Sequence, residues 1–325
     1  MTRFWLQSTT IGLGAGACAA LLLSAQSRSA LSLVLYALAA LPILIAAIGW
    51  SHWAGLLAGI VAALGIAPAF GPANAFGVLF GVGLPAWWLG YLTLLARPDA
   101  ATGELEWYPP GRLLLWCAVL GALAMATSLI DLVSGDATFL QTLRQLVRQL
   151  LRAQMQIPEG QPLVIPGTDN PERLVDVLVV LMAPIGALFS TLIEMVDLWL
   201  AARILRVSGR LKRPWPDLAA MRLPAATPLA LAAALAASFV SGVPGFVAAL
   251  LAGSLLFAYA VIGFAVMHDI TRHLHGRVVM LIGMYATVIV LIWPILLMGL
   301  LGLIDTALDL RRRVAAARGP PAPLA

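Results

Sequence analysis

The stretch SALSLVLYALAALPILIAAIGWSHWAGLLAGIVAALGIAPAFGPANAFGVLFGVGLPAWWLGYLTLLA, residues 29–96, decides the fold class because it contains no Asp, Glu, Lys or Arg. A helix needs about 20 apolar residues to cross the hydrocarbon core of a bilayer. Residues 29–96 therefore hold about three crossings. Turn-forming residues at 49–52 and at 68–72 divide the stretch into these segments.

The composition of the whole chain excludes a soluble domain. Of its 325 residues, 61% are hydrophobic and 11% are charged, with a mean hydropathy of +0.95, whereas soluble domains have roughly 25% charged residues. The net charge of +5 is divided among short clusters. These clusters form no basic face for a phosphate backbone, so nucleic acid is excluded as a partner. Cys18 and Cys117 stand inside apolar runs, which is typical of small core residues and not of a disulfide or zinc framework.

Further gaps between ionised residues mark the other membrane segments, because a charge at mid-bilayer is costly. Residues 223–268 hold two segments, split at the turn 241–244. The first apolar segment has no signal-peptide cleavage site and is kept as a helix of the mature chain. The predicted fold is an all-α, polytopic transmembrane helix bundle with eight or nine membrane-embedded segments and one interfacial amphipathic helix. The remaining segments, one in each range, are 4–27, 113–130, 177–193 and 278–304.

Four regions follow from these boundaries. Residues 1–205 form a six-helix membrane core, residues 206–222 a basic loop, residues 223–310 the C-terminal membrane helices, and residues 311–325 a basic, Pro/Ala-rich tail.

Basic residues predict the sidedness. Short loops rich in Lys and Arg stay in the cytoplasm, and six basic residues lie between Arg203 and Arg222. Counting segments back from this loop predicts a multi-pass protein of the bacterial inner membrane with a cytoplasmic N-terminus. Counting forward leaves the C-terminus open. Three full crossings place residues 311–313 outside, whereas a break at Pro294 would make residues 278–310 a half-hairpin.

Two acidic motifs close hydrophobic segments. Asp197 in MVDLW (195–199) and Asp305 in LIDTA (303–307) are each followed six residues later by an arginine. This pattern is typical of a salt-bridged anchor at the membrane interface. The alternative is an acidic site inside the membrane, for protons or ions, to which Glu194 and Asp309 would also belong.

Residues 138–157 have the pattern of an amphipathic helix. Apolar residues recur at helical spacing, and Arg144, Arg148 and Arg152 follow at four-residue steps on the other face. This predicts a helix in the membrane plane on the outer side, with its arginines at the lipid interface. A lid over a substrate opening and a docking surface for a partner remain alternatives. The Pro/Gly-rich residues 158–171 form a loop.

Signatures of the common enzyme classes are absent. The sequence has no P-loop, no H-E-x-x-H and no G-x-S-x-G, so we expect no enzymatic activity, no catalytic residue and no cofactor. His268, His273 and His275 cluster with Asp269, but only Asp269 and His273 have i, i+4 spacing. We therefore predict no metal site.

Several motifs together resemble the YybS-like family of uncharacterised bacterial integral membrane proteins. They are LPAWWLG (84–90), EWYP (106–109), FAY (257–259) and the closing residues 303–313. The family has no established activity. Its first six helices are similar to the substrate-binding components of energy-coupling-factor vitamin transporters, which implies a six-helix core near residues 4–205 and membrane-protein partner subunits.

The same resemblance implies that small residues of the first helix contact a coupling subunit. Here these positions are Gly12, Gly16 and Ala20. The spacing is also the general small-residue pattern that lets membrane helices pack closely.

Two functions remain open. One is a small-solute binding or transport component that depends on partner subunits, and the other is a structural or assembly protein of the cell envelope that acts through lipid and protein contacts. For the first, we expect a ligand pocket near the outer face, beneath residues 138–172, where the chain is broken between Pro68 and Asn74. Asn74 supplies an amide, and Trp87 and Trp88 supply aromatic surface.

Overall fold

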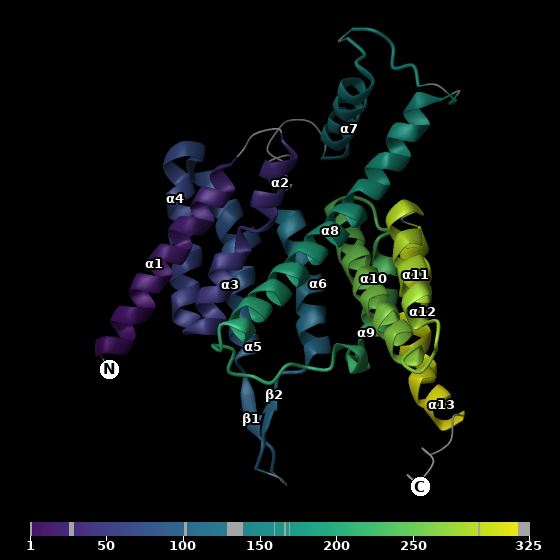
Figure 1. Ribbon diagram of the computed structural model, residues 1–325. Helices are drawn as coiled ribbons and strands as arrows, with labels where there is room; N and C mark the ends of the chain where they lie inside the picture. Colours follow the sequence, from purple (N-terminus) through teal and green to yellow (C-terminus); the bar gives the residue numbers. More distant parts are fainter. Residues whose placement is uncertain are drawn as a thin grey trace.

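A computed structural model describes residues 2–25, 29–100, 103–128, 139–158, 160–165, 167–168, 170–291 and 293–317. The chain is a bundle of helices with one short β-hairpin at one end (Figure 1). The elements, in chain order, are α1 (Thr2–Ser24), α2 (Ala30–Ala37), α3 (Ala40–Gly49), α4 (His52–Val78), the π-helical turn η1 (Leu79–Gly83), α5 (Leu84–Thr93), β1 (Ala96–Pro98), β2 (Leu105–Trp107), α6 (Pro110–Ser128), α7 (Phe139–Met155), α8 (Pro171–Val207), the 3-10 turn η3 (Leu218–Ala220), α9 (Thr227–Ala237), α10 (Val243–Ile270), α11 (Arg277–Leu291), α12 (Pro294–Leu308) and α13 (Leu310–Ala317).

The structure is nearly all-α, as the sequence predicts, apart from the hairpin of β1 and β2. Within the described part of the chain, six helical stretches are long and apolar enough to cross a membrane, where the sequence predicts eight or nine embedded segments. The shorter apolar helices are α9, α11 and α12. The six stretches are Trp5–Ser24, Ala30–Gly49, His52–Thr93, Pro110–Ser128, Pro171–Val207 and Val243–Ile270.

The stretch His52–Thr93 is two arms in space, because the chain turns back at Gly71. Gly71 has a φ of +85°, a conformation that glycine adopts without the penalty of a Cβ atom. Gly59 and Gly83, equally far from Gly71 along the chain, pack backbone to backbone. The turn predicted at residues 68–72 is therefore where the chain reverses.

The small-residue face of α1 packs inside the chain. A Cβ atom on Gly12 would lie 2.9 Å from the carbonyl oxygen of Ala54, and one on Gly16 would lie 2.6 Å from that of Ala58. Ala20 continues this face, because a Cβ atom on Gly65 of α4 would lie 2.9 Å from the Cβ atom of Ala20. Gly12, Gly16 and Ala20 do form a helix-packing face. Its partner is α4, however, so it is not free for a coupling subunit as the resemblance implied.

The C-terminal helices return to the end of the bundle where α8 ends. Arg272, just before α11, donates hydrogen bonds to Asp217, and Arg311, just after α12, donates to the carbonyl oxygens of Ala219 and Met221 at 2.7 and 3.1 Å. Both ends of the α11–α12 pair are thus held by the same loop. α11 and α12, which begins at Pro294, therefore form a hairpin with both of its ends at the same end of the bundle. The side of the membrane on which the C-terminus lies stays a prediction.

We call the end that holds residues 208–226 the basic end. The N-terminus of α1 and the described part of the tail lie at this end (Figure 1). Residues 318–325 of the predicted tail lie outside the described residues. The division into four regions stays a prediction. α8 of the first region packs against α10 of the third, and the Ser254 hydroxyl donates to the Ala187 carbonyl oxygen at 3.2 Å.

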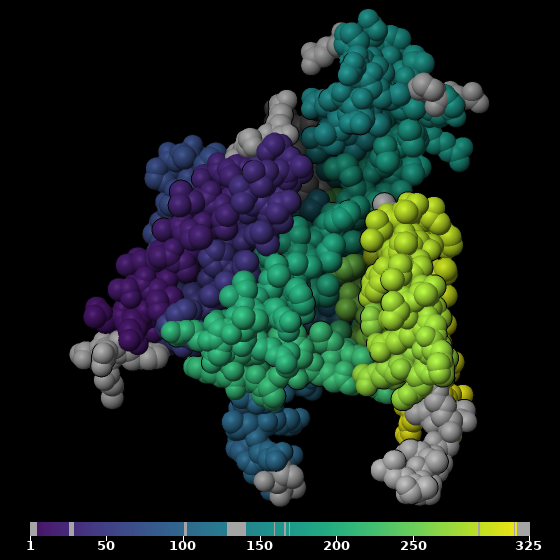
Figure 2. All heavy atoms as spheres, viewed as in Figure 1, coloured from purple at the N-terminus to yellow at the C-terminus, as the bar shows by residue number. Residues whose placement is uncertain are grey.

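At the opposite end, α7 packs along the first turns of α8 and both project from the bundle (Figures 1 and 2). With 37 residues α8 is about 55 Å long, well beyond the roughly 30 Å of a hydrocarbon core. Leu143 and Val147 of α7 are buried against Val175 and Val179 of α8. The amphipathic helix predicted over residues 138–157 is present as Phe139–Met155. It ends two residues earlier than predicted, where Gln156 has a φ of +56°, and residue 138 lies outside the described residues. Part of its apolar stripe contacts α8, where the sequence alone suggested lipid.

The arginine face of α7 meets carboxylates of α8. Arg144 pairs with Asp176 at 2.7 Å, and Arg148 pairs with Glu172. Arg152 donates instead to the carbonyl oxygen of Pro158 at 3.1 Å. The contact of these three arginines with lipid stays a prediction.

Candidate functional site

Two cavities lie on different sides of α8. The first, of about 670 Å³, lies among α2, α4, η1, α6 and α8, towards the α7 end. The second, of about 880 Å³, lies among α6, α8, α10, α11 and the loop after α8. We call them the Glu194 cavity and the Arg213 cavity. Both volumes are in the range of small-molecule sites.

Polar groups of three helices meet in the Glu194 cavity. Asn74 of α4, Thr127 and Ser128 of α6, and Ser190 and Glu194 of α8 line it. Apolar wall is added by residues that include Tyr36, Phe76 and Phe80. Such a mixture of a few polar groups on an apolar wall is typical of sites that orient a small molecule.

Glu194 and Asp197 are the unusual residues of this region. They are three residues apart on α8, with exposed fractions of 5% and 1%, and a carboxylate oxygen of each is buried without a hydrogen-bond partner. The Thr191 hydroxyl, one turn away, donates to the Ala187 carbonyl oxygen and not to Glu194. A carboxylate buried without a partner in a membrane protein is costly to maintain. It therefore marks a place where a ligand, an ion or a proton would be stabilised.

The structure separates the residues of the predicted pocket. Asn74 lines the Glu194 cavity, and its amide nitrogen donates to the Phe70 carbonyl oxygen at 2.7 Å. Trp87 and Trp88 do not line this cavity. Trp88 packs against Trp116 with ring centroids 5.3 Å apart, and Trp87 stacks on Tyr91 at 6.4 Å. Both tryptophans are half-buried, and Trp88 packs against the core to which α1, α3, α4 and α5 contribute. α5 carries them away from the turn at Gly71.

The histidine cluster shows no metal geometry in the part of the chain that is described, where no group of three or more His, Cys, Asp or Glu residues could hold an ion. Asp269 pairs instead with Arg272 at 3.2 Å. The ring Nδ1 of His268 donates to the carbonyl oxygen of Phe264 at 2.9 Å.

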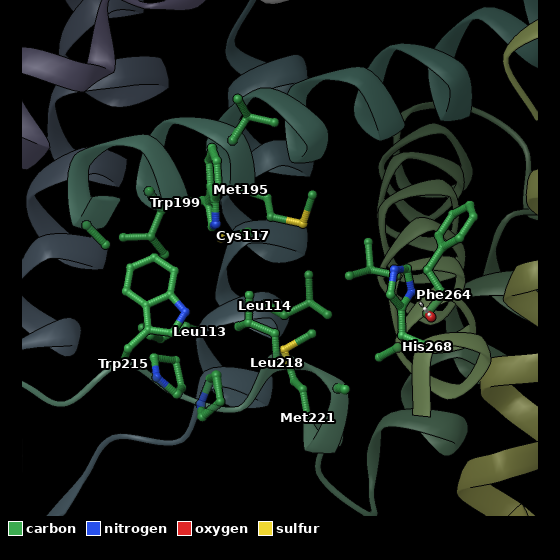
Figure 3. A pocket seen from close by; sticks show the side chains of 18 of the residues that line it. Leu113, Leu114, Cys117, Met195, Trp199, Trp215, Leu218, Met221, Phe264 and His268 are labelled. Atoms are coloured by element: carbon green, nitrogen blue, oxygen red, sulfur yellow. Dashed lines mark hydrogen bonds between the residues drawn. The ribbon is translucent and has the colours of Figure 1, made fainter. Parts of the chain in front are cut away.

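The Arg213 cavity is apolar along most of its wall (Figure 3). Met195 and Trp199 of α8 face Phe264 and His268 of α10 across it, and Trp215 and Leu218 of the loop close it at the basic end. Arg213, Arg272 and Arg277 supply positive charge, and no acidic residue lines the cavity among those that the structure describes.

The arginines of this cavity differ in how they are paired. Arg272 contacts both Asp217 and Asp269, and its hydrogen bond lowers the pKa of Asp217. Arg213 donates one hydrogen bond, to the Tyr108 carbonyl oxygen at 3.2 Å. The Nε atoms of Arg213 and Arg277 are buried without a partner, and burial lowers the pKa of Arg213. An anion in this cavity would thus meet two incompletely bonded guanidinium groups.

A comparison with known families matches residues 17–306 to the family described as predicted membrane proteins, DUF2232. The chain belongs to this family. The match covers both cavities and the helices around them, and it establishes a membrane protein without assigning an activity. No curated protein and no solved structure matches the chain.

The sequence alone does not point to the Arg213 cavity, because the residues that line it lie in segments far apart along the chain, from Thr93 to Tyr285. The sequence does point to the two acidic motifs, but in the structure only one of them forms the expected salt bridge. Asp305 forms a salt bridge with Arg311 at 2.8 Å, as an anchor would. Asp197 has no such bridge among the described residues, and Arg203 lies against the ring of Trp215. The second interpretation, an acidic site inside the membrane, fits only the Glu194–Asp197 pair.

Proposed function

We propose that this protein is a small-solute binding component of a bacterial membrane transport system, and that the solute binds in the Glu194 cavity. The observation that carries the proposal is the Glu194 carboxylate, which is buried with one oxygen unpartnered. The cavity that it lines also holds the amide of Asn74 and four residues with a hydroxyl group, Tyr36, Thr127, Ser128 and Ser190. A buried carboxylate with a purely structural role would be paired, as Asp305 is with Arg311.

The chemistry of the cavity favours a solute with a positive charge or several hydrogen-bond donors on a partly aromatic body. The carboxylate accepts hydrogen bonds from an amine most strongly, because a charged pair gains most where water is excluded. Tyr36, Phe76 and Phe80 offer aromatic contact to the rest of the molecule.

The proposal includes the orientation predicted from the arginines. The chain sits in the inner membrane with the basic end in the cytoplasm, so the Glu194 cavity faces the outer side and receives its solute there. It also includes dependence on partner subunits that supply energy, as in the energy-coupling-factor systems that residues 4–205 resemble. The chain itself catalyses no reaction.

The test is a binding screen on the purified full chain in detergent. Small primary amines and aromatic heterocycles bearing an amine are added, and the melting temperature is followed. We expect at least one class to stabilise the wild type and to lose its effect on Glu194→Gln. The matched control is Glu172→Gln on the exposed part of the same helix, which should bind like the wild type. Equal loss in both variants, or stabilisation that Glu194→Gln retains, would refute the site.

Copurification in mild detergent tests the partner requirement. A pair of ATPase subunits retained with the chain supports transport. Retention of envelope-synthesis proteins without ATPases supports the second candidate, a structural or assembly protein of the envelope. That candidate is favoured by one observation, the α7–α8 pair that projects beyond the bundle (Figure 2), since such a projection suits contacts with other proteins outside the membrane.

A further inference from the structure

The Arg213 cavity combines two features that a soluble solute does not need together. One part of its lining is basic, while Met195, Trp199 and Phe264 form an apolar wall. Arg213 belongs to the loop after α8, and Arg272 and Arg277 lie between the end of α10 and the first residue of α11. The apolar wall runs along α8 and α10, where Met195, Trp199 and Phe264 lie (Figure 3). This is the layout that fits an amphiphile with an anionic headgroup.

The basic part is built to receive an anion. Arg213 has an exposed fraction of 9%, and its Nε lacks a partner. Arg277, the first residue of α11, also has an unpartnered, buried Nε. A guanidinium group binds phosphate oxygens through two parallel hydrogen bonds, and a buried, incompletely bonded arginine is costly without a counter-charge.

Neighbouring charges leave the cavity positive. Two acidic residues close to the cavity, Asp217 and Asp269, both contact Arg272. The Arg206 guanidinium carbon lies 4.9 Å from the ring centroid of Trp215, which lines the cavity. Arg213 and Arg277 are therefore the groups that an entering anion would neutralise.

The apolar part opens at the side of the bundle, between α8 and α11. No residue of α11 is buried, and this helix touches α10 through Tyr285, whose ring stacks on Phe264 at a centroid distance of 5.3 Å. On the other side of the opening, Trp199 of α8 is 46% exposed. Figure 2 shows the surface hollowed between α8 and the C-terminal helices. A hydrocarbon chain can enter sideways here, whereas a soluble anion gains nothing from this wall.

We propose that the Arg213 cavity binds one anionic membrane lipid, with its headgroup at the part of the lining that holds Arg213 and Arg277 and a hydrocarbon chain between Trp199 and Phe264. The lipid comes from the leaflet at the basic end. This site is separate from the solute site proposed above and stands whether or not that proposal holds.

The test uses the full chain purified in a neutral maltoside detergent and stripped of lipid. Dioleoyl phosphatidylglycerol, dioleoyl phosphatidylcholine and inorganic phosphate are titrated separately, and bound lipid is counted by native mass spectrometry. We expect one phosphatidylglycerol bound about tenfold or more tightly than phosphatidylcholine, since hydrogen bonds to charged groups are among the stronger ones. Inorganic phosphate should displace it only weakly.

Variants assign the site. Arg277→Gln and Arg213→Gln should each weaken phosphatidylglycerol binding about tenfold, while Arg313→Gln, an exposed arginine at the same end, should leave it unchanged. Arg277 begins a helix with no buried residue, so its variant stays informative if Arg213→Gln fails to fold. Equal binding of the two lipids, full displacement by inorganic phosphate, or an Arg277→Gln variant that binds like Arg313→Gln would overturn the proposal.

Discussion

Adding one methyl group at Gly16 should destabilise the protein, while adding the same group at Gly14 should not. The two glycines lie two residues apart on α1. A Cβ atom at Gly16 would lie 2.6 Å from the Ala58 carbonyl oxygen and 2.6 Å from the Val61 Cβ atom, whereas one at Gly14 meets nothing within 4 Å. Because one neighbour at Gly16 is backbone of α4, relief requires α1 and α4 to separate.

The magnitude follows from this geometry. The gain in helix propensity on changing Gly to Ala, up to about 1 kcal/mol, is common to both positions and cancels in the comparison. Overpacking costs about 1–3 kcal/mol, so Gly16→Ala should have a free energy of unfolding about 1–3 kcal/mol below that of Gly14→Ala. Reversible unfolding in mixed micelles, followed by tryptophan fluorescence, measures the difference. If the two variants have the same free energy of unfolding, α1 does not pack on α4 through this face. The small residues of α1 are then available to a partner subunit.

Two further perturbations address the basic end. Asp305→Asn removes the counter-charge of the buried Arg311, so the free energy of unfolding should fall by about 3–5 kcal/mol in the same assay. Arg312→Gln, at an exposed position, is the control, and an equal loss in both variants would contradict the reasoning. Acid should weaken the contact between Arg222 and Asp309, because their hydrogen bond holds the pKa of Asp309 below its usual value in the folded protein. This contact stabilises the folded state fully above the pKa of an unfolded Asp, about 3.9. The stabilisation is lost as the pH falls through the lower pKa of Asp309 in the folded state. The melting temperature of the wild type should therefore drop more steeply than that of Asp309→Asn below about pH 4, and parallel curves would rule this contribution out.

The sequence predicts well whatever depends on the cost of charge in lipid. The charge-free residues 29–96 are helical over most of their length, and the turn at residues 68–72 is where the chain reverses at Gly71. The arginine stripe of residues 138–157 likewise predicts the helix α7. These features are local, so they depend on spacing and composition alone.

What the sequence leaves open depends on which surfaces meet. An apolar stripe is the same pattern whether it faces lipid or another helix, so the burial of Leu143 and Val147 against α8 could not be read from it. Glu194 and Asp197 lie near an arginine cluster in the sequence, which favours an interfacial anchor, yet their side chains turn into the bundle. Trp87 and Trp88 come soon after the predicted turn along the chain. They lie on α5, which runs away from the turn, so they do not line the Glu194 cavity.

The middle of α8 is a partition one helix thick. Glu194 lines one cavity and Met195, the next residue, lines the other; an α-helix with its side chains is about 10–12 Å across. A bound molecule that shifts α8 enlarges one cavity and narrows the other. By thermodynamic reciprocity, each occupant would then alter the affinity of the other by the same factor. Two molecules held at opposite ends of the bundle would thus sense each other without contact, and a titration of either one in the presence of the other would measure the strength of that link.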